Sequence, residues 1–290
     1  VQFLFVLRGC FVEALIPKGR KWAFNDVGFI HASVEQRYVQ PQFFYRDRAR
    51  TCRYLIIGAP GAIGKSAFAQ HLANTKNAMV WDLSSLRLGS NTFIGSVVKA
   101  VGPARLSEFL ESIRSGETVL VFDALDEAEL HSGWAGVESL LRDVVELTTE
   151  SVNCSVIFLA RRDTAELIEM SLEEILEDGA QIASASIGFF DRAGAVEFLL
   201  EQVRRIRGEN EVDRLEAVYR EKSLEAISMG VDGVAVDARR VAWVNEEEER
   251  FFGYAPVLQT LAAVLAHADN PHKLKFERAP DEHSEIIAKI

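Results

Sequence analysis

From residue 53 onward, short apolar runs alternate with longer stretches that carry apolar residues at helical spacing. Four of the runs are strongly apolar: YLII at 54–57, AMVWDL at 78–83, TVLVF at 118–122 and VIFLA at 156–160. A fifth run, QIASASIGF at 181–189, is less apolar. Apolar strands separated by helices are typical of a parallel sheet that is buried on both faces. The pattern predicts a three-layer α/β/α domain with about five mostly parallel strands.

The stretches between these runs show the helical period. One apolar stripe, between the third and fourth runs, consists of Val137, Leu140, Leu141, Val144 and Val145. After residue 190 the strand signal fades, and apolar stripes of helical period continue toward the end of the chain. We therefore expect an approach segment at 1–50 without a sustained period, a sheet domain at 51–190 and an all-helical lid at 191–290.

Composition narrows the class of protein. The 290 residues are 48% hydrophobic, which is enough to bury a large core. Forty-three acidic against 32 basic side chains give a net charge of −11, which disfavours broad binding to nucleic acid or anionic lipid. The three cysteines, Cys10, Cys52 and Cys154, are far apart and lack metal-ligand spacing. We expect them to be reduced core residues of a cytoplasmic protein.

The two ends of the sequence bear on its completeness. Arg8 interrupts the first apolar run, which is too short for a membrane span and unlike a signal peptide. The chain begins with Val1, and its last residues, SEIIAKI, have the pattern of an amphipathic helix. We expect a module of a longer protein, with unknown sensor and effector parts.

A glycine-rich turn follows the first predicted strand. APGAIGKS at 59–66 fits the phosphate-binding pattern [AG]xxxxGK[ST] between a strand and a helix. Its glycines let backbone N–H groups converge on an anion, and the helix N-terminus adds its positive dipole end. Lys65 would contact the β- and γ-phosphates, and the Ser66 hydroxyl would bind Mg²⁺. The predicted nucleotide-binding residues are Ala59, Pro60, Gly61, Ala62, Ile63, Gly64, Lys65, Ser66 and Ala67. The alternative is an ordinary glycine turn.

An acidic segment, TVLVFDALDEAEL, supplies a second element of the site. Asp123 ends an apolar strand, where a carboxylate lies near the phosphate turn of a parallel sheet and can hold Mg²⁺. Glu127, or in second place Asp126, would polarise the water that attacks the γ-phosphate. The alternative is a solvated acidic loop that caps the next helix.

DALDEA resembles the extended acidic motif of the NACHT group within the STAND class of P-loop NTPases. VIFLAR is similar to the fourth strand of that group, which ends in a sensor arginine, here Arg161. FFDRAGAVEFLLEQV resembles the opening of the helical lid, and YAPVLQTLAAVLA resembles the stretch whose proline approaches the nucleotide, here Pro256. The resemblance covers about residues 53–268. It departs from the usual motif at Ala124, where glycine is common.

The resemblance implies an ATPase that binds ATP or ADP with Mg²⁺ and hydrolyses slowly. It further implies a signalling switch in which nucleotide controls opening and self-association, as in innate immunity or anti-phage defence. Two alternatives stay open: an AAA+-like motor, whose arginine would reach across a subunit boundary, and a small-molecule kinase-like P-loop module. The sequence has no NKxD-like guanine-binding motif, which favours ATP over GTP.

Overall fold

The computed structural model describes residues 5–7, 10–22, 29–30, 37–45, 52–148, 153–176, 181–231 and 253–276. The chain divides into two compact units. The first comprises Val1–Tyr38 and Gln42–Gly188, and the second comprises Val39–Pro41 and Phe189–Ile290. The predicted boundary between sheet domain and lid lies two residues further on, after residue 190.

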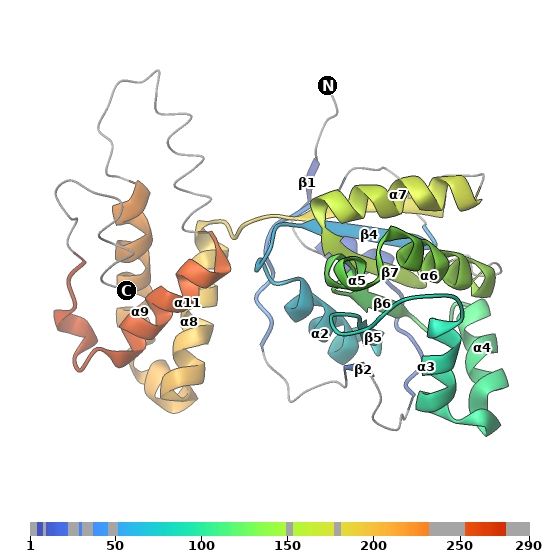
Figure 1. The fold of residues 1–290 in the computed structure, drawn as a ribbon. Helices are drawn as coiled ribbons and strands as arrows, with labels where there is room; N and C mark the ends of the chain where they lie inside the picture. The colour runs from blue at the N-terminus through green and yellow to red at the C-terminus, as the bar shows by residue number, and fades with distance from the viewer. Residues whose placement is uncertain are drawn as a thin grey trace, which may run out of the picture. The chain divides into compact units, whose positions relative to one another are not determined.

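The first unit contains one sheet with the strand order β1-β3-β8-β4-β7-β6-β5-β2 over the described residues (Figure 1). The five central strands are parallel to one another and coincide with the five apolar runs of the sequence. They are β4 (Tyr54–Ala59), β5 (Met79–Asp82), β6 (Leu120–Asp123), β7 (Val156–Arg161) and β8 (Ile182–Ile187). The predicted parallel α/β sheet is confirmed.

Three short antiparallel strands extend the sheet at its two edges. β3 (Phe43–Tyr45) pairs with β8, β1 (Phe5–Leu7) pairs with β3, and β2 (Phe29–Ile30) pairs with β5. All three come from the approach segment, for which the sequence predicted no regular element. Strands of two or three residues are too short to show a period of two, so the hydrophobic pattern could not reveal them.

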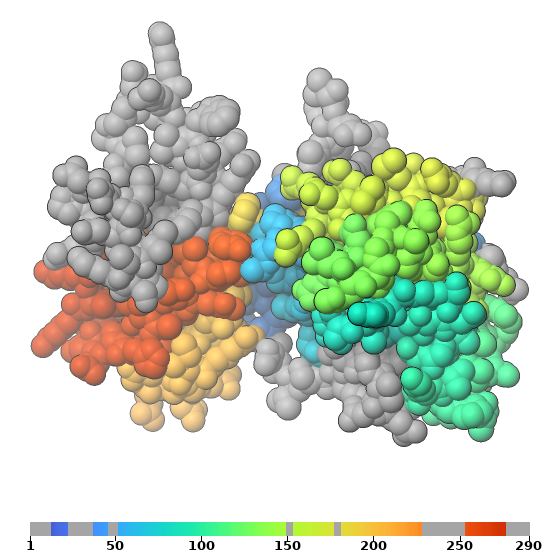
Figure 2. Space-filling view, viewed as in Figure 1, coloured from blue at the N-terminus to red at the C-terminus, as the bar shows by residue number. Residues whose placement is uncertain are grey.

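Helices cover both faces of the sheet. α7 and α2 lie on opposite sides of β4 in Figure 1, and α6 and α7 form adjoining surfaces in Figure 2. The helices of this unit are α1 (Cys10–Leu15), α2 (Lys65–Lys76), α3 (Thr92–Val101), α4 (Leu106–Arg114), α5 (Leu125–Ser132), α6 (Trp134–Leu147) and α7 (Arg162–Leu176). A short 3-10 turn, η1 (Pro103–Arg105), precedes α4.

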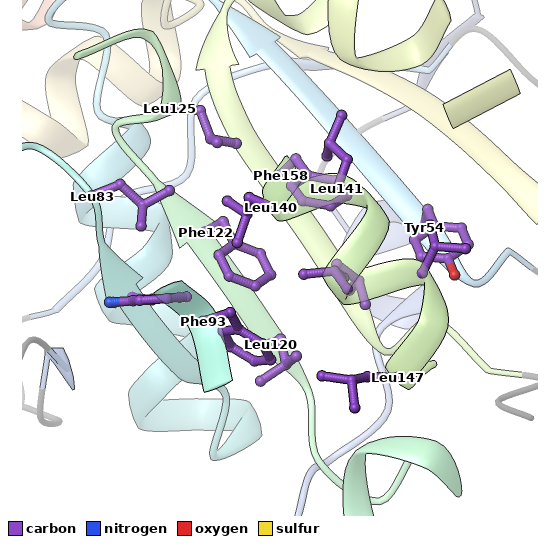
Figure 3. Close-up of a cluster of buried hydrophobic side chains, with 14 of the residues drawn as sticks. Tyr54, Leu83, Phe93, Leu120, Phe122, Leu125, Leu140, Leu141, Leu147 and Phe158 are labelled. Atoms are coloured by element: carbon purple, nitrogen blue, oxygen red, sulfur yellow. The ribbon is translucent and has the colours of Figure 1, made fainter. Parts of the chain in front are cut away.

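The core beneath α3, α4, α6 and α7 is rich in aromatic side chains. Phe122 of β6 stacks on Phe158 of β7, with ring centroids 5.4 Å apart, and Trp81 of β5 lies 5.6 Å from Phe122. Figure 3 shows Leu140 and Leu141 of α6 among these rings. The whole predicted stripe of α6 is buried. Burial of each side chain of this size stabilises the folded protein by roughly 1.5–3 kcal/mol. The packing on this face therefore holds in place the strand ends that carry the site.

The second unit is helical in its described part. Its elements are α8 (Arg192–Arg207), α9 (Glu209–Val231), α11 (Ala255–His267) and the 3-10 turn η3 (Pro271–Lys273). The Asp191 side chain caps α8 by accepting a hydrogen bond from the Gly194 N–H at 2.7 Å. Leu199 and Leu258 belong to the apolar core that joins α8 and α11. The predicted lid residues 232–252 and 277–290 lie outside the described residues.

Across the described ranges, none of the helices has both the length and the apolar character that a bilayer crossing requires.

Candidate nucleotide site

The turn between β4 and α2 has a backbone conformation in which few side chains are tolerated. Gly64, the N-cap residue of α2, has φ 101° and ψ 23°, and Ala62 has φ 55°. Residues with a side chain rarely adopt such positive φ values, so Gly64 is demanded by the turn itself. Because Gly64 carries no side chain, it cannot cap the first N–H groups of α2 as Asp191 caps α8. These N–H groups lie at the positive end of the helix dipole.

Neither close packing nor the backbone conformation requires a glycine at residue 61. A Cβ atom built at Gly61 would meet no protein atom within 4 Å, and its φ lies outside the positive range. The glycine therefore keeps open a space that the described protein atoms do not fill. Such a space beside backbone N–H groups suits the close approach of a phosphate group.

Lys65 and Ser66 open α2 beside this space. Ser66 is exposed and Lys65 is half-exposed, and the lysine forms no ion pair with another described residue. Of the remaining predicted loop residues, Ile63 is buried, Pro60 is half-buried and Ala67 is exposed. The charged and hydroxyl groups of the loop are thus accessible, while Ile63 anchors the turn to the core.

The structure brings Ser66 and Asp123 together. The Ser66 hydroxyl forms a hydrogen bond with the Asp123 carboxylate, which also accepts the Ala124 N–H at 2.9 Å. Asp123 is only 3% exposed, and burial raises the pKa of its carboxyl group. The pKa of Asp123 is lowered, in turn, by the hydrogen bonds from Ser66 and Ala124 and by the positive charge of Lys65.

The strand order explains how these two residues meet. β7 lies between β4 and β6, so Asp123 does not stand on the strand next to the loop. However, α2 contacts β5 and β6, because it crosses the sheet to reach the start of β5. Its first turn therefore passes the carboxyl end of β6. This crossover is the reason that the Ser66 hydroxyl reaches Asp123.

Asp126 and Glu127 occupy the first turn of α5 but have different surroundings. Ala124, which precedes this helix, has φ 61° and ψ 35°, a left-handed conformation that turns the chain after Asp123. The Asp126 side chain is 11% exposed and forms an ion pair with Arg161. Glu127 is exposed, and its carboxylate pairs with no other described residue. Of the two acids Asp126 and Glu127, Glu127 is therefore the one whose carboxylate is available to a water molecule.

Arg161 ends β7 and lies directly opposite Ala59, the first residue of the predicted phosphate loop, in the β4–β7 register. Its Nε atom is 2.9 Å from the Asp126 carboxylate, and its N–H donates to the same carboxylate at 3.3 Å. The Arg161 side chain is 66% exposed. The arginine therefore stands at the loop, with its charge engaged by Asp126.

Pro256 belongs to the other unit. It lies in the first turn of α11, where proline is favoured because the missing N–H has no helical partner. Its predicted approach to the nucleotide remains a prediction.

One acidic residue at this edge did not enter the sequence prediction. Asp82 ends β5 and is paired in register with Asp123 of β6. The signal was present in the sequence, since AMVWDL, like TVLVFD, places an aspartate after an apolar run. Only the pairing of β5 with β6 shows that the two acids are neighbours.

The oxygen donors of the site suit Mg²⁺. In the described part of the chain, no cluster of three or more histidine, cysteine or acidic residues could hold a metal ion by itself. Ser66 and Asp123 offer a hydroxyl and a carboxylate, and in phosphate sites Mg²⁺ takes one or two carboxylates together with phosphate oxygens and water. These residues fit an ion that is held jointly with a nucleotide.

The strand order, the glycine loop between β4 and α2 and the acidic end of β6 define the fold as that of a P-loop NTPase. No protein-family model and no curated protein matches the chain. Among solved structures, a Walker-type ATPase of Pyrococcus abyssi is similar at 14% identity and a TM-score of 0.39, over 73% of this chain and 91% of that one.

Proposed function

We propose that this chain is an ATP-binding switch of the STAND type, and most closely of its NACHT group, that hydrolyses ATP slowly. The observation that carries the proposal is the meeting of the Ser66 hydroxyl with the buried Asp123 carboxylate beside an open glycine loop. This constellation supports binding of a nucleoside triphosphate, and the resemblance of DALDEA to the NACHT motif supports the finer class.

Each residue has a defined part in this proposal. The N–H groups of the loop and the Lys65 ammonium bind phosphate oxygens, and Ser66 and Asp123 hold Mg²⁺. Mg²⁺, when bound, neutralises charge on the phosphates. Glu127 orients the attacking water and accepts its proton. Arg161 senses the γ-phosphate from its position opposite Ala59.

The ion pair of Arg161 with Asp126 supports a switch. Arg161 can pair either with Asp126 of its own chain or with the γ-phosphate of a bound nucleotide. The nucleotide would thus select between two arrangements of the arginine. In the proposed cycle, the ATP state opens the molecule and allows self-association, and ADP returns it to rest. Pro256 would couple the helical unit to the nucleotide. The resemblance to the NACHT group suggests innate immune or anti-phage defence as the biological role.

An AAA+-like motor is the second candidate, and one observation favours it. The Arg161 side chain is 66% exposed and Arg162 is exposed, so either could act across a subunit boundary. A motor needs fast turnover that rises with assembly. A turnover well below about 1 s⁻¹, compared with a typical enzyme value of about 10 s⁻¹, favours the switch.

Nucleotide binding by paired lysine variants tests the site. Lys65→Ala removes the predicted phosphate contact and is expected to weaken ATP binding at least about tenfold, since hydrogen bonds to charged groups contribute about 1.5–3 kcal/mol. Lys99→Ala, which removes an exposed lysine of α3, is the matched control and should bind normally. Equal ATP affinity of the Lys65→Ala variant and the wild type in a calorimetric titration would show that the site is wrongly assigned.

The bound nucleotide tests the mode of action. Protein purified without added nucleotide is denatured, and the released small molecules are separated by chromatography. Trapped ADP is the result expected of a switch that retains its product. An empty site together with fast turnover would favour the motor.

A further inference from the structure

Asp82 and Asp123 hold laterally paired positions at the ends of two adjacent parallel strands. The Leu83 N–H donates to the Asp123 carbonyl oxygen at 3.0 Å, so the pairing continues past both acids. Adjacent strands lie about 4.8 Å apart. Asp123 is buried and Asp82 is half-buried. Two carboxyl groups therefore share the edge of the sheet that the Ser66 hydroxyl faces.

This arrangement places like charges next to each other. Like charges that stand side by side on a sheet destabilise it unless a cation compensates them. The groups that act on Asp123 are Ser66, the Ala124 N–H, Asp82 and Lys65. Lys65 is the one cation among these groups, against the carboxylates of Asp82 and of Asp123 itself, so a divalent cation would balance the negative charge that remains.

The fold itself requires an oxygen atom at residue 82, but it does not require a charge. The Asp82 Oδ1 atom accepts the Ser84 N–H at 2.9 Å and so holds the turn after β5. An asparagine side chain offers the same carbonyl oxygen to that N–H. The turn therefore accounts for the shape of the side chain and leaves its negative charge unexplained.

We propose that Asp82 is a positioning residue of the divalent-cation site, where its carboxylate acts with that of Asp123 to hold the water ligands of Mg²⁺. Mg²⁺ in phosphate sites keeps several water molecules, and these need carboxylate oxygens as acceptors. The inference rests on the proposed function, because it adds a residue to the same site. It assigns to the end of β5 a role that neither the loop motif nor the acidic motif includes.

Metal affinity measured with Mn²⁺ separates the charge of Asp82 from its role in the turn. Mn²⁺ is titrated into the protein–ADP complex, and free Mn²⁺ is followed by electron paramagnetic resonance. Asp82→Asn keeps the acceptor for the Ser84 N–H and removes the charge, so we expect Mn²⁺ affinity to fall about tenfold. ADP affinity in the presence of EDTA should stay unchanged, because no metal then needs to be held.

Asp143 offers a matched control. Its Oδ2 atom accepts the Asn91 N–H at 2.9 Å, so it too is an aspartate that holds a backbone N–H. Asp143→Asn should leave Mn²⁺ affinity unchanged. Asp123→Asn should abolish it, because that variant removes the principal carboxylate of the site.

A measurement on the wild-type chain makes the test independent of the folding of any variant. Fe²⁺ replaces Mg²⁺ in the ADP complex, and ascorbate with hydrogen peroxide then cleaves the backbone close to the ion. Peptide mapping should find cuts at 65–66, 123–124 and also 82–84.

The outcomes distinguish the inference from the proposed function. Wild-type Mn²⁺ affinity in the Asp82→Asn variant, or cuts at 65–66 and 123–124 without cuts at 82–84, overturns the role of Asp82 and leaves the nucleotide site standing. A wild-type protein that binds no Mn²⁺–ADP overturns both.

Discussion

The Arg161 Nε atom lies 2.9 Å from the Asp126 carboxylate, so two residues that the sequence offered as separate catalytic candidates are partners in one ion pair. The Arg161 N–H also donates to Asp126 at 3.3 Å. Asp126 thus ties the helix after the acidic strand to the end of the neighbouring strand. This contact gives Asp126 a role in holding the arginine, and it leaves Glu127 as the carboxylate open to water.

Removing the charge of Asp126 should release the arginine. The arginine of this pair is 66% exposed, and surface ion pairs contribute about 0.2–1 kcal/mol. Asp126→Asn is therefore expected to raise ATP affinity by up to about fivefold and to change ADP affinity little. Arg161→Ala should instead reduce the difference between the two nucleotides and make the protease sensitivity of the helical unit the same in both states. Arg142→Ala, at an exposed arginine of α6, is the control. If the ratio of ATP affinity to ADP affinity is the same as in the wild type in both Asp126→Asn and Arg161→Ala, the ion pair has no part in the mechanism.

Glu127→Gln should bind ATP normally and hydrolyse it about 10²–10⁴-fold more slowly, because general base catalysis contributes a factor of this size. Single-turnover hydrolysis of radiolabelled ATP measures the effect. Asp126→Asn serves as the comparison, and it should slow hydrolysis much less, since Asp126 is occupied by Arg161. The opposite ranking of the two variants would assign the base to Asp126.

Ala124→Gly should stabilise the protein. Ala124 has φ 61° and ψ 35°, where a Cβ atom is strained and glycine is not. Part of the gain is lost because glycine makes the unfolded chain more flexible, so we expect a net increase of about 0.5–1 kcal/mol in the free energy of unfolding. Urea unfolding gives the value. Ala128→Gly, in the interior of α5, the helix that Ala124 precedes, should destabilise the protein. A loss of stability in both variants would contradict the strain at residue 124.

The pair of Glu13 with His71 predicts a dependence of stability on pH. The Glu13 carboxylate lies 3.1 Å from the His71 Nε2 atom, and the hydrogen bond from His71 lowers the pKa of Glu13 below its ordinary value of 4.5. A lowered pKa in the folded state stabilises the protein above pH 4.5, and this contribution disappears as the pH falls through the folded value. Glu13→Gln should therefore lose up to about 1 kcal/mol near neutral pH.

Urea unfolding of the wild type and the Glu13→Gln variant at several pH values tests this prediction. The two stabilities should converge as the medium is acidified below pH 4.5. Glu117→Gln removes a carboxylate with 61% exposure that lies 4.0 Å from Arg20, and it should show little effect at any pH. A difference between wild type and Glu13→Gln that persists into acid would contradict the assigned cause.

Cys52 and Cys154 should form a disulfide under mild oxidation. They stand opposite each other just before β4 and β7, because Tyr54 is paired with Val156, and their thiols form a hydrogen bond. Hydrogen peroxide would oxidise the Cys52 thiolate to a sulfenic acid with loss of hydroxide, and attack by the Cys154 thiol would form the S–S bond and release water.

Mass spectrometry of a non-reducing digest should find the peptide pair Cys52–Cys154 after peroxide treatment. Cys10→Ser is the control and should leave this link unaffected, whereas Cys52→Ser should abolish it. Preferential links through Cys10 would overturn the prediction.

The sequence by itself determined the five parallel strands, the glycine-rich turn after β4 and the acid at the end of β6. These features depend on neighbours along the chain. Four strongly apolar runs and a weaker fifth fixed the strands, glycines at 61 and 64 fixed the turn, and Asp123 follows its run directly. Local backbone preference and the need to bury apolar surface act over short stretches, so a single sequence displays them.

Only the tertiary structure decided which side chains meet. The placement of β7 between β4 and β6, the pairing of Asp82 with Asp123 and the contact of Asp126 with Arg161 all join segments that are distant in the sequence. Strand order and register result from the packing of whole faces, which no local pattern encodes. For the same reason the short strand at 43–45 became visible only through its pairing with β8.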